Sequence, residues 1–200
     1  MNRRIIICGG NGSGKSTLGK ALAQAMGIPF MDNEDYYFPG KKTGYKYVCA
    51  LTKEELIPIL QNDMEQAEDW IFASVKGDYG ERIESLFTYA VLLQVPKEVR
   101  MQRIRNRSHD KFGDKMLPGG ELYEREQRFF DMVQNRPEDY AEGWVLKLKC
   151  PVIRVDGRRP VQENVALLME EVRCYFGGTG GGYGFCRDNT VWNAYIDRSR

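Results

Sequence analysis

A glycine-rich segment near the N-terminus carries the clearest chemical pattern of this chain. Residues 9–17 read GGNGSGKST and match the pattern GxxxxGK[ST]. Glycines allow the backbone to curl so that successive N–H groups point at one anion, and Lys15 adds a full positive charge for the β- and γ-phosphates of a nucleotide. The hydroxyl of Ser16 is suited to ligate Mg²⁺. A turn without a ligand is the alternative. The predicted nucleotide contacts are Gly10, Asn11, Gly12, Ser13, Gly14, Lys15, Ser16 and Thr17.

A strand and a helix must position this loop. Residues 3–8 are apolar and largely β-branched, which predicts a buried strand. After the loop, apolar residues recur at helical spacing until Gly27 ends the pattern. A helix that begins near Lys15 directs its positive dipole end at a bound anion. The motif therefore stands in the context that phosphate binding requires.

Strands and helices alternate along the rest of the chain. Further strands are predicted over residues 28–32, 70–75, 88–95 and 151–155. Helices are predicted over 52–67, 97–107, 121–134 and 137–149, followed by a last helix with an apolar stripe from Val161 to Val172. Thr52 and Glu55 form a predicted capping box, whereas 33–50 and 108–120 have the composition of exposed loops. The alternation predicts an α/β fold with a mainly parallel five-stranded sheet, because each crossover helix packs back on the sheet.

The composition excludes several classes of protein. Of 200 residues, 42% are hydrophobic and 28% are charged, and the formal net charge is +1. Such usage excludes wholesale disorder and coiled coils, and the near-zero charge gives no bulk electrostatic case for nucleic acid or a membrane as a partner. No apolar run approaches the roughly 20 residues that span a bilayer. Five cysteines without a CxxC pair argue against a zinc site or a disulfide framework, so we expect a cytoplasmic protein.

The opening segment, GGNGSGKSTLGKALAQAMGIPFMD, resembles the P-loop kinases of small molecules, such as adenylate, shikimate, gluconate and uridine kinases. The resemblance implies a P-loop NTPase fold of three layers, α/β/α, and the use of ATP with Mg²⁺. It also implies a mobile acceptor-binding flap at about 33–50 and an arginine-bearing lid at about 108–120. These parts would belong to a kinase-like domain over 1–176, followed by a glycine-rich tail over 177–200, which we expect to be mobile.

Two acidic residues follow the second predicted strand. Asp32 ends that strand, at the edge where ligands bind in open α/β sheets, and Asp35 follows closely. In shikimate and uridine kinases, acids at the similar place serve as a base for an acceptor hydroxyl or help to hold magnesium. The resemblance implies one of these roles for Asp32 first. Asp35 is expected to bind the acceptor. A solvated turn that favours Asp and Asn is the alternative for both.

Several cations are candidates for phosphate or acceptor contacts. Arg103 and Arg107 share one face of a predicted helix, and the resemblance favours Arg107 at the nucleotide as a catalytic cation, with Arg103 nearby. Lys76 and Arg82 flank GDYG in a stretch that resembles the acceptor-contacting segment of gluconate kinases. The alternative for Arg103 and Arg107 is that both side chains are merely exposed to solvent. Asp156 resembles a residue of the loop beside adenine, and a turn role explains it equally well.

The leading hypothesis is an ATP–Mg²⁺-dependent phosphotransferase that acts on a small acceptor. Aromatic residues beside the acids favour a nucleotide or nucleoside, although packing under a flap explains those rings equally well. A sugar-acid or other small-metabolite kinase is the alternative acceptor class. A nucleotide-binding NTPase switch and a nucleic-acid end kinase are further alternatives, and the near-zero net charge argues against the latter. The aromatic residues are Tyr36, Tyr37, Phe38, Tyr45 and Tyr47.

Overall fold

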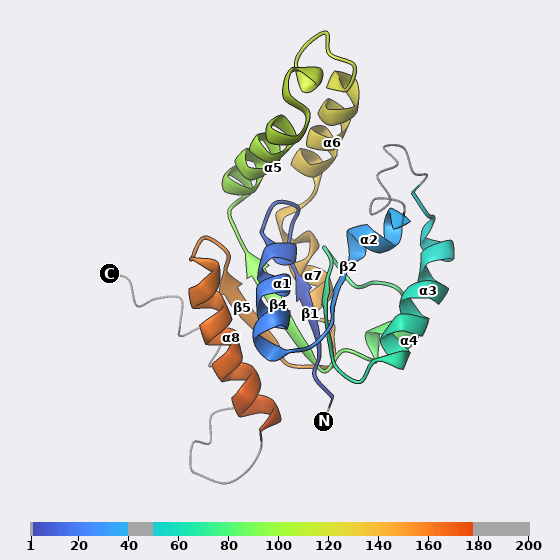
Figure 1. The fold of residues 1–200 in the computed structure, drawn as a ribbon, viewed down its shortest axis with the longest axis vertical. Helices are drawn as coiled ribbons and strands as arrows, with labels where there is room; N and C mark the ends of the chain where they lie inside the picture. The colour runs from blue at the N-terminus through green and yellow to red at the C-terminus, as the bar shows by residue number, and fades with distance from the viewer. Residues whose placement is uncertain (1, 40–49, 178–200) are drawn as a thin grey trace.

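Five parallel strands form the centre of the molecule (Figure 1). The computed structural model describes residues 2–39 and 50–177. The sheet order is β2-β3-β1-β4-β5, and every neighbouring pair is parallel. The predicted five-stranded sheet is therefore confirmed, with β1 in its middle. The strands are β1 (Arg4–Cys8), β2 (Phe30–Asp32), β3 (Trp70–Ala73), β4 (Tyr89–Gln94) and β5 (Val152–Asp156).

Helices cover both faces of the sheet, because successive side chains of a strand point to opposite faces. Ile5 and Ile7 of β1 belong to a core with α1 (Lys15–Met26) and α8 (Val161–Phe176). Ile6 belongs to the opposite core, against α3 (Lys53–Gln66), α4 (Glu81–Glu84) and α7 (Glu142–Val145). The predicted three-layer α/β/α arrangement is confirmed.

The chain after β2 continues as a helix. In α2 (Asn33–Tyr37), Asp32 is the N-cap, and its Oδ1 accepts a hydrogen bond from the backbone N of Glu34 at 3.0 Å. The predicted loop over 33–50 is therefore wrong for its first five residues, since Asp32 satisfies a donor of the first helical turn. Residues 40–49 of the predicted flap, with Tyr45 and Tyr47, lie outside the described residues. The predicted tail does too, apart from Gly177.

The start of α3 follows the prediction. Thr52 Oγ1 accepts from the backbone N of Glu55 at 3.2 Å, and Glu55 accepts in return from the backbone N of Thr52 at 2.8 Å. The predicted capping box is thereby confirmed. Pro58 lies within the helix, which continues to Gln66.

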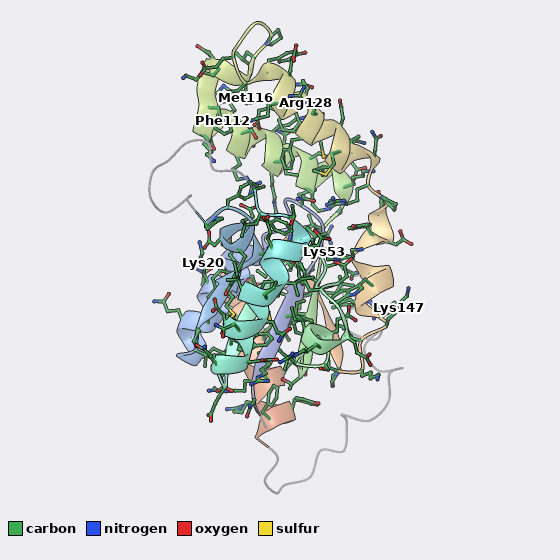
Figure 2. The ribbon with its side chains drawn as sticks, turned by 90° about the vertical axis from the view of Figure 1, so that its right-hand side faces the viewer. Lys20, Lys53, Phe112, Met116, Arg128 and Lys147 are labelled. Carbon is green, nitrogen blue, oxygen red and sulfur yellow. The ribbon has the colours of Figure 1, made fainter. Side chains whose placement is uncertain are left out.

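A helical hairpin stands beyond the carboxyl ends of the strands (Figure 1). It comprises α5 (Lys97–Phe112), the short 3₁₀ helix η2 (Gly113–Met116) and α6 (Tyr123–Asn135). Figure 2 shows Phe112 and Met116 toward the end of the hairpin that lies away from the sheet. The predicted loop over 108–120 is wrong for 108–116, which are helical, and right for 117–120, which form a turn. Apolar side chains of the helical part pack across the hairpin instead of on the sheet. The buried cluster consists of Met101, Ile104, Met116, Phe130 and Val133.

Two smaller differences concern short helices. The 3₁₀ helix η3 (Glu138–Tyr140) and α7 stand where one helix was predicted over 137–149, and α4 was not predicted. Within residues 2–39 and 50–177, no helix combines the length and apolar character needed to cross a membrane.

Candidate active site

The phosphate loop joins the end of β1 to the start of α1. Gly12 and Gly14 have φ angles of 78° and 99°, a region that favours glycine. A Cβ at Gly10 would collide with the guanidinium of Arg100, and a Cβ at Gly12 would lie 2.5 Å from the Arg100 carbonyl oxygen. The glycines therefore permit both the curl of the loop and the close approach of α5.

Lys15, the first residue of α1, folds its ammonium over this loop. Its Nζ donates a hydrogen bond to the carbonyl oxygen of Gly10 at 3.0 Å. Burial lowers the pKa of Lys15 from 10.5 to about 8, whereas the negative charges of Glu34 and Asp32 act to raise it. The acidic end of β2 is thus close enough to influence Lys15. An anion seated on the loop would favour the charged ammonium in the same way.

Asp32 uses one of its two carboxylate oxygens as a helix cap. Its Oδ1 caps α2, the turn role weighed from the sequence. The hydrogen bonds among the described residues leave its Oδ2 unengaged. Asp35 lies within α2 and is partly buried. Ala73 of β3 pairs with both Ile7 of β1 and Asp32 of β2, so Asp32 lies at the sheet edge where the phosphate loop begins, and Asp35 lies further along α2.

The oxygen donors near the loop fit Mg²⁺ only together with other ligands. Ser16 is the second residue of α1, and Asp32 supplies a carboxylate at the end of β2. In the part of the chain that the structure describes, no group of three or more His, Cys, Asp or Glu side chains could hold a metal. Mg²⁺ usually takes one or two protein ligands and completes its shell with waters and substrate phosphates, so this donor set fits it.

Arg103, which the resemblance places near the nucleotide, lies beside the phosphate loop. Both of its terminal nitrogens donate to the carbonyl oxygen of Gly157 at 3.1 Å, and Nη1 is 3.4 Å from that of Ser13. Arg103 also lines a cavity of about 300 Å³ between α1 and the start of α8, together with Thr17 and Pro160. This volume is at the lower end of the range for small-molecule sites.

Arg107 occupies a different environment. It lies four residues beyond Arg103 on the same face of α5 and is exposed. In the described residues, the structure does not bring Arg107 to the phosphate loop.

Two further arginines contact the loop and were missed in the sequence. Arg100 is buried, and its guanidinium donates to the carbonyl oxygens of Val95 at 3.0 Å and Asn11 at 3.3 Å. Arg136 follows α6 and donates from Nη1 to Oδ1 of Asn11 at 2.7 Å. The seven-residue spacing from Arg100 to Arg107 signals a shared helical face. We find no sequence signal that joins Arg136 to Asn11.

Lys76 lies near Arg136 because both contact one aromatic ring. The ammonium of Lys76 is 4.1 Å from the ring centroid of Tyr140, and the guanidinium of Arg136 is 4.7 Å from it. Lys76 also pairs with Asp78 at 3.0 Å. Arg136 bonds to Asn11 of the phosphate loop, and Tyr140 links Arg136 to Lys76.

Arg82 lies apart from Lys76. It pairs with Glu65 at 2.9 Å, near the end of α3. Lys53, at the opposite end of α3, is 3.9 Å from Asp78. Twelve residues separate the two ends, about 18 Å along a helix. The structure therefore does not bring together the two cations that the sequence placed around GDYG.

Asp156 stabilises the turn that follows β5. Its carboxylate accepts from the backbone N of Arg158 at 2.9 Å and pairs with the Arg158 guanidinium at 2.7 Å. These bonds hold the pKa of Asp156 below its usual range. The turn role that the sequence left open is thus present at this residue.

A glycine-rich loop between a central parallel strand and a helix is the phosphate-binding arrangement of P-loop proteins. The chain belongs to the AAA domain family, which matches residues 5–128. The predicted resemblance to P-loop small-molecule kinases is confirmed.

Two curated relatives are similar to this chain over different shares of their length. Uncharacterized protein YqaC of Bacillus subtilis is 29% identical over 178 residues, covering 85% of this chain and 97% of that protein. A "probable gluconokinase" of Dictyostelium discoideum is 26% identical over 130 residues, covering 56% of this chain and 65% of that protein.

Solved structures share the fold. Shikimate kinase from Aquifex aeolicus has a TM-score of 0.51 at 20% identity, with 88% of this chain and 99% of that chain covered. Shikimate kinase from Acinetobacter baumannii, in complex with shikimate, has a TM-score of 0.52 at 15% identity, with 88% and 96% covered. At these identities the likeness establishes the fold alone.

Proposed function

We propose that this protein transfers the γ-phosphoryl group of ATP to a hydroxyl group of a small anionic acceptor, with a sugar acid as the favoured class. The observation that carries the proposal is the arrangement around the phosphate loop. Asp32 lies at the sheet edge where the loop begins, and the cations Lys76 and Arg136 both contact the ring of Tyr140. A base and an anion-binding pair near one phosphate site suit a hydroxyl acceptor that carries a carboxylate.

The nucleotide roles follow from the same arrangement. The loop from Gly10 to Thr17 would bind the phosphates through its backbone N–H groups, and Lys15 would contact the β- and γ-phosphates. Arg103 would contact the nucleotide beside the cavity at α8. Arg107 stays a candidate catalytic cation that would have to approach with the hairpin. Ser16 and Asp32 would help to hold Mg²⁺, which neutralises charge on the phosphates when bound.

The acceptor class is inferred from the cations and from what the aromatic residues already do. The hydroxyl of Tyr36 donates to Asp63 at 2.9 Å, and Tyr37 packs against the core beside α3. Both rings therefore fit the packing interpretation better than stacking on a nucleobase, which weakens the case for a nucleotide or nucleoside acceptor. The gluconokinase name of one relative supports a sugar acid. Of the acceptor contacts proposed from the sequence, Asp35 and Lys76 remain, and Arg136 joins them. Arg82, which pairs with Glu65 away from Lys76, does not fit the same small acceptor.

The same proposal assigns a role to each part of the chain. Residues 1–176 would form the kinase domain, and the hairpin that contains 108–120 would be its lid. Residues 33–50, which begin with α2, would be the acceptor flap. Residues 177–200 would form a separate tail.

An acceptor screen tests the function. ADP release from ATP with Mg²⁺ is measured in the presence of gluconate and other sugar acids, nucleosides or nucleoside monophosphates, and the phosphorylated product is identified. We expect at least one sugar acid to stimulate ADP release with one product formed per ADP. Stimulation by a nucleotide or nucleoside alone would assign the other acceptor class. A release rate unchanged by every acceptor would favour an NTPase switch and contradict the proposal.

A further inference from the structure

A partly buried hydrogen bond joins the segment after β3 to the start of α2. Only 6% of Tyr79 is exposed, and its hydroxyl donates to Oδ1 of Asn33 at 2.5 Å. Asn33 is the first residue of α2 and directly follows Asp32. Burial raises the pKa of Tyr79 above its usual range, so the phenol keeps its proton at neutral pH and remains a donor.

Packing fixes the Tyr79 ring independently of its hydroxyl. The ring makes an edge contact with Phe72 of β3, at 6.1 Å between centroids. On the side of α3, the ammonium of Lys53 lies 5.6 Å from the ring centroid. Figure 2 shows Lys53 at the end of α3 that faces the hairpin. The hydroxyl of Tyr79 therefore projects from an anchored ring.

The same segment holds Lys76. The hydroxyl of Ser74, which follows β3, donates to the carbonyl oxygen of Lys76 at 2.5 Å, and the Lys76 ammonium pairs with Asp78 at 3.0 Å. Tyr79 follows Asp78 directly. One short stretch thus carries both Lys76, the proposed acceptor-binding cation, and the Tyr79 hydroxyl, which donates a hydrogen bond to α2.

A helix of five residues needs tertiary contacts to keep its orientation. At its far end, α2 is tied to α3 by the bond from Tyr36 to Asp63. At its near end, the bond from Tyr79 holds the residue next to Asp32. The backbone of Asp32 is held by the pairing of β2 with β3, opposite Ala73, so the Tyr79 bond acts on how α2 leaves the sheet. Without the Tyr79 hydroxyl, the first residue of α2 would lose its side-chain tether, and the Asp32 carboxylate, which caps α2, would lose its fixed orientation relative to Lys76.

We propose that Tyr79 is a positioning residue that, through Asn33, holds the carboxylate of Asp32 in place relative to the acceptor bound at Lys76. This inference rests on the proposed role of Asp32. Tyr79 touches neither nucleotide nor acceptor in this scheme. Its hydroxyl contributes to turnover by keeping the base and the acceptor in a reactive geometry, where a displacement of about 1 Å can cost up to a hundredfold in rate.

Tyr79→Phe tests the inference, because it removes the hydroxyl and keeps the ring. We expect kcat to fall by roughly tenfold or more while the KM for ATP stays unchanged. Thr88→Val is the matched control. It removes a hydroxyl that donates to Asn2 at 2.8 Å and accepts from the backbone N of Arg4 at 2.9 Å, beside the amino ends of the strands. This control should shift the melting temperature by a similar amount and leave kcat unchanged.

A second variant separates positioning from stability. Asn33→Ala removes the acceptor of the same hydrogen bond, so it should reproduce the loss in kcat, and the double variant should be no slower than the slower single one. If Tyr79→Phe fails to fold, Asn33→Ala alone decides the question. Independent, additive losses in the two variants would overturn the proposal.

Asp32→Asn distinguishes the two possible failures. Wild-type turnover in Asp32→Asn would contradict the proposed base and, with it, the positioning role. Slow turnover in Asp32→Asn together with wild-type kcat in both Tyr79→Phe and Asn33→Ala would overturn the positioning role alone.

Discussion

The pKa of Lys15 leads to a measurable prediction about nucleotide binding. Burial lowers this pKa from 10.5 to about 8 in the free protein. A triphosphate on the loop places negative charge next to the ammonium and should restore its pKa to its ordinary value or higher. Binding should therefore take up a proton wherever free Lys15 is partly neutral. The affinity for the nucleotide should fall as the pH rises above about 8.

The size of the effect follows from the two pKa values. With a pKa of about 8, Lys15 is about 90% protonated at pH 7 and about 10% protonated at pH 9. If the bound form stays protonated, proton uptake rises from about 0.1 at pH 7 to about 0.9 at pH 9. By the same linkage, the Kd for the nucleotide should increase about fivefold from pH 8 to pH 9 and approach tenfold per pH unit above pH 9, until the bound form also titrates.

Calorimetry with a non-hydrolysable ATP analogue and Mg²⁺ measures this uptake. Titrations at pH 7, 8 and 9 in buffers of different ionisation enthalpy give the number of protons taken up. Lys15→Arg is the control, because a guanidinium stays charged throughout this range. The reasoning would be refuted by wild-type protein that takes up no proton at pH 9, or by uptake that persists unchanged in Lys15→Arg.

Three further predictions concern turnover, the acceptor and stability. Asp32→Asn keeps a side chain that can cap α2 but removes the proposed base. We therefore expect kcat to fall by about a hundredfold or more while ATP affinity changes little, and an unchanged kcat would make the carboxylate purely structural. Lys76→Ala should raise the KM for the acceptor by about tenfold or more, measured against the exposed Lys147→Ala control; equal effects of the two would contradict a Lys76 contact. Thr52→Ala should cost about 1 kcal/mol of unfolding free energy and lower the melting temperature by roughly 2–4 °C in calorimetry; an unchanged melting temperature would mean that the capping box does not stabilise α3.

The phosphate loop and its supports were predictable because their signals are local. The strand before Gly9, the glycines and the helix from Lys15 are specified within 24 residues, and the structure has them as β1, the loop and α1. The Thr52 capping box is equally local, since its two hydrogen bonds join residues three apart. The parallel sheet followed from the alternation of strands and helices, because each crossover must bring the chain back to the same edge.

The two long helices of the hairpin were predicted, but the segment that connects them was misread for a physical reason. The hairpin's apolar residues face one another across α5, η2 and α6, so each helix shows only a narrow stripe between many charged residues. Three glycines and a proline between 113 and 120 made the segment look like a loop. What stabilises the helical turns there is contact between Met116 and residues on both helices, and such contacts have no local signature.

The sequence by itself determined the phosphate loop, the strand and helix that hold it, and the class of fold, because each of these depends on neighbours in the chain. Only the tertiary structure brought Lys76 and Arg136 to Tyr140, and Arg136 to Asn11, which is 125 residues away. It also turned Arg82 toward Glu65 and away from Lys76. Side-chain partners of this kind depend on how α3, α6 and the segment after β3 pack on the sheet, and residue spacing carries no record of that packing.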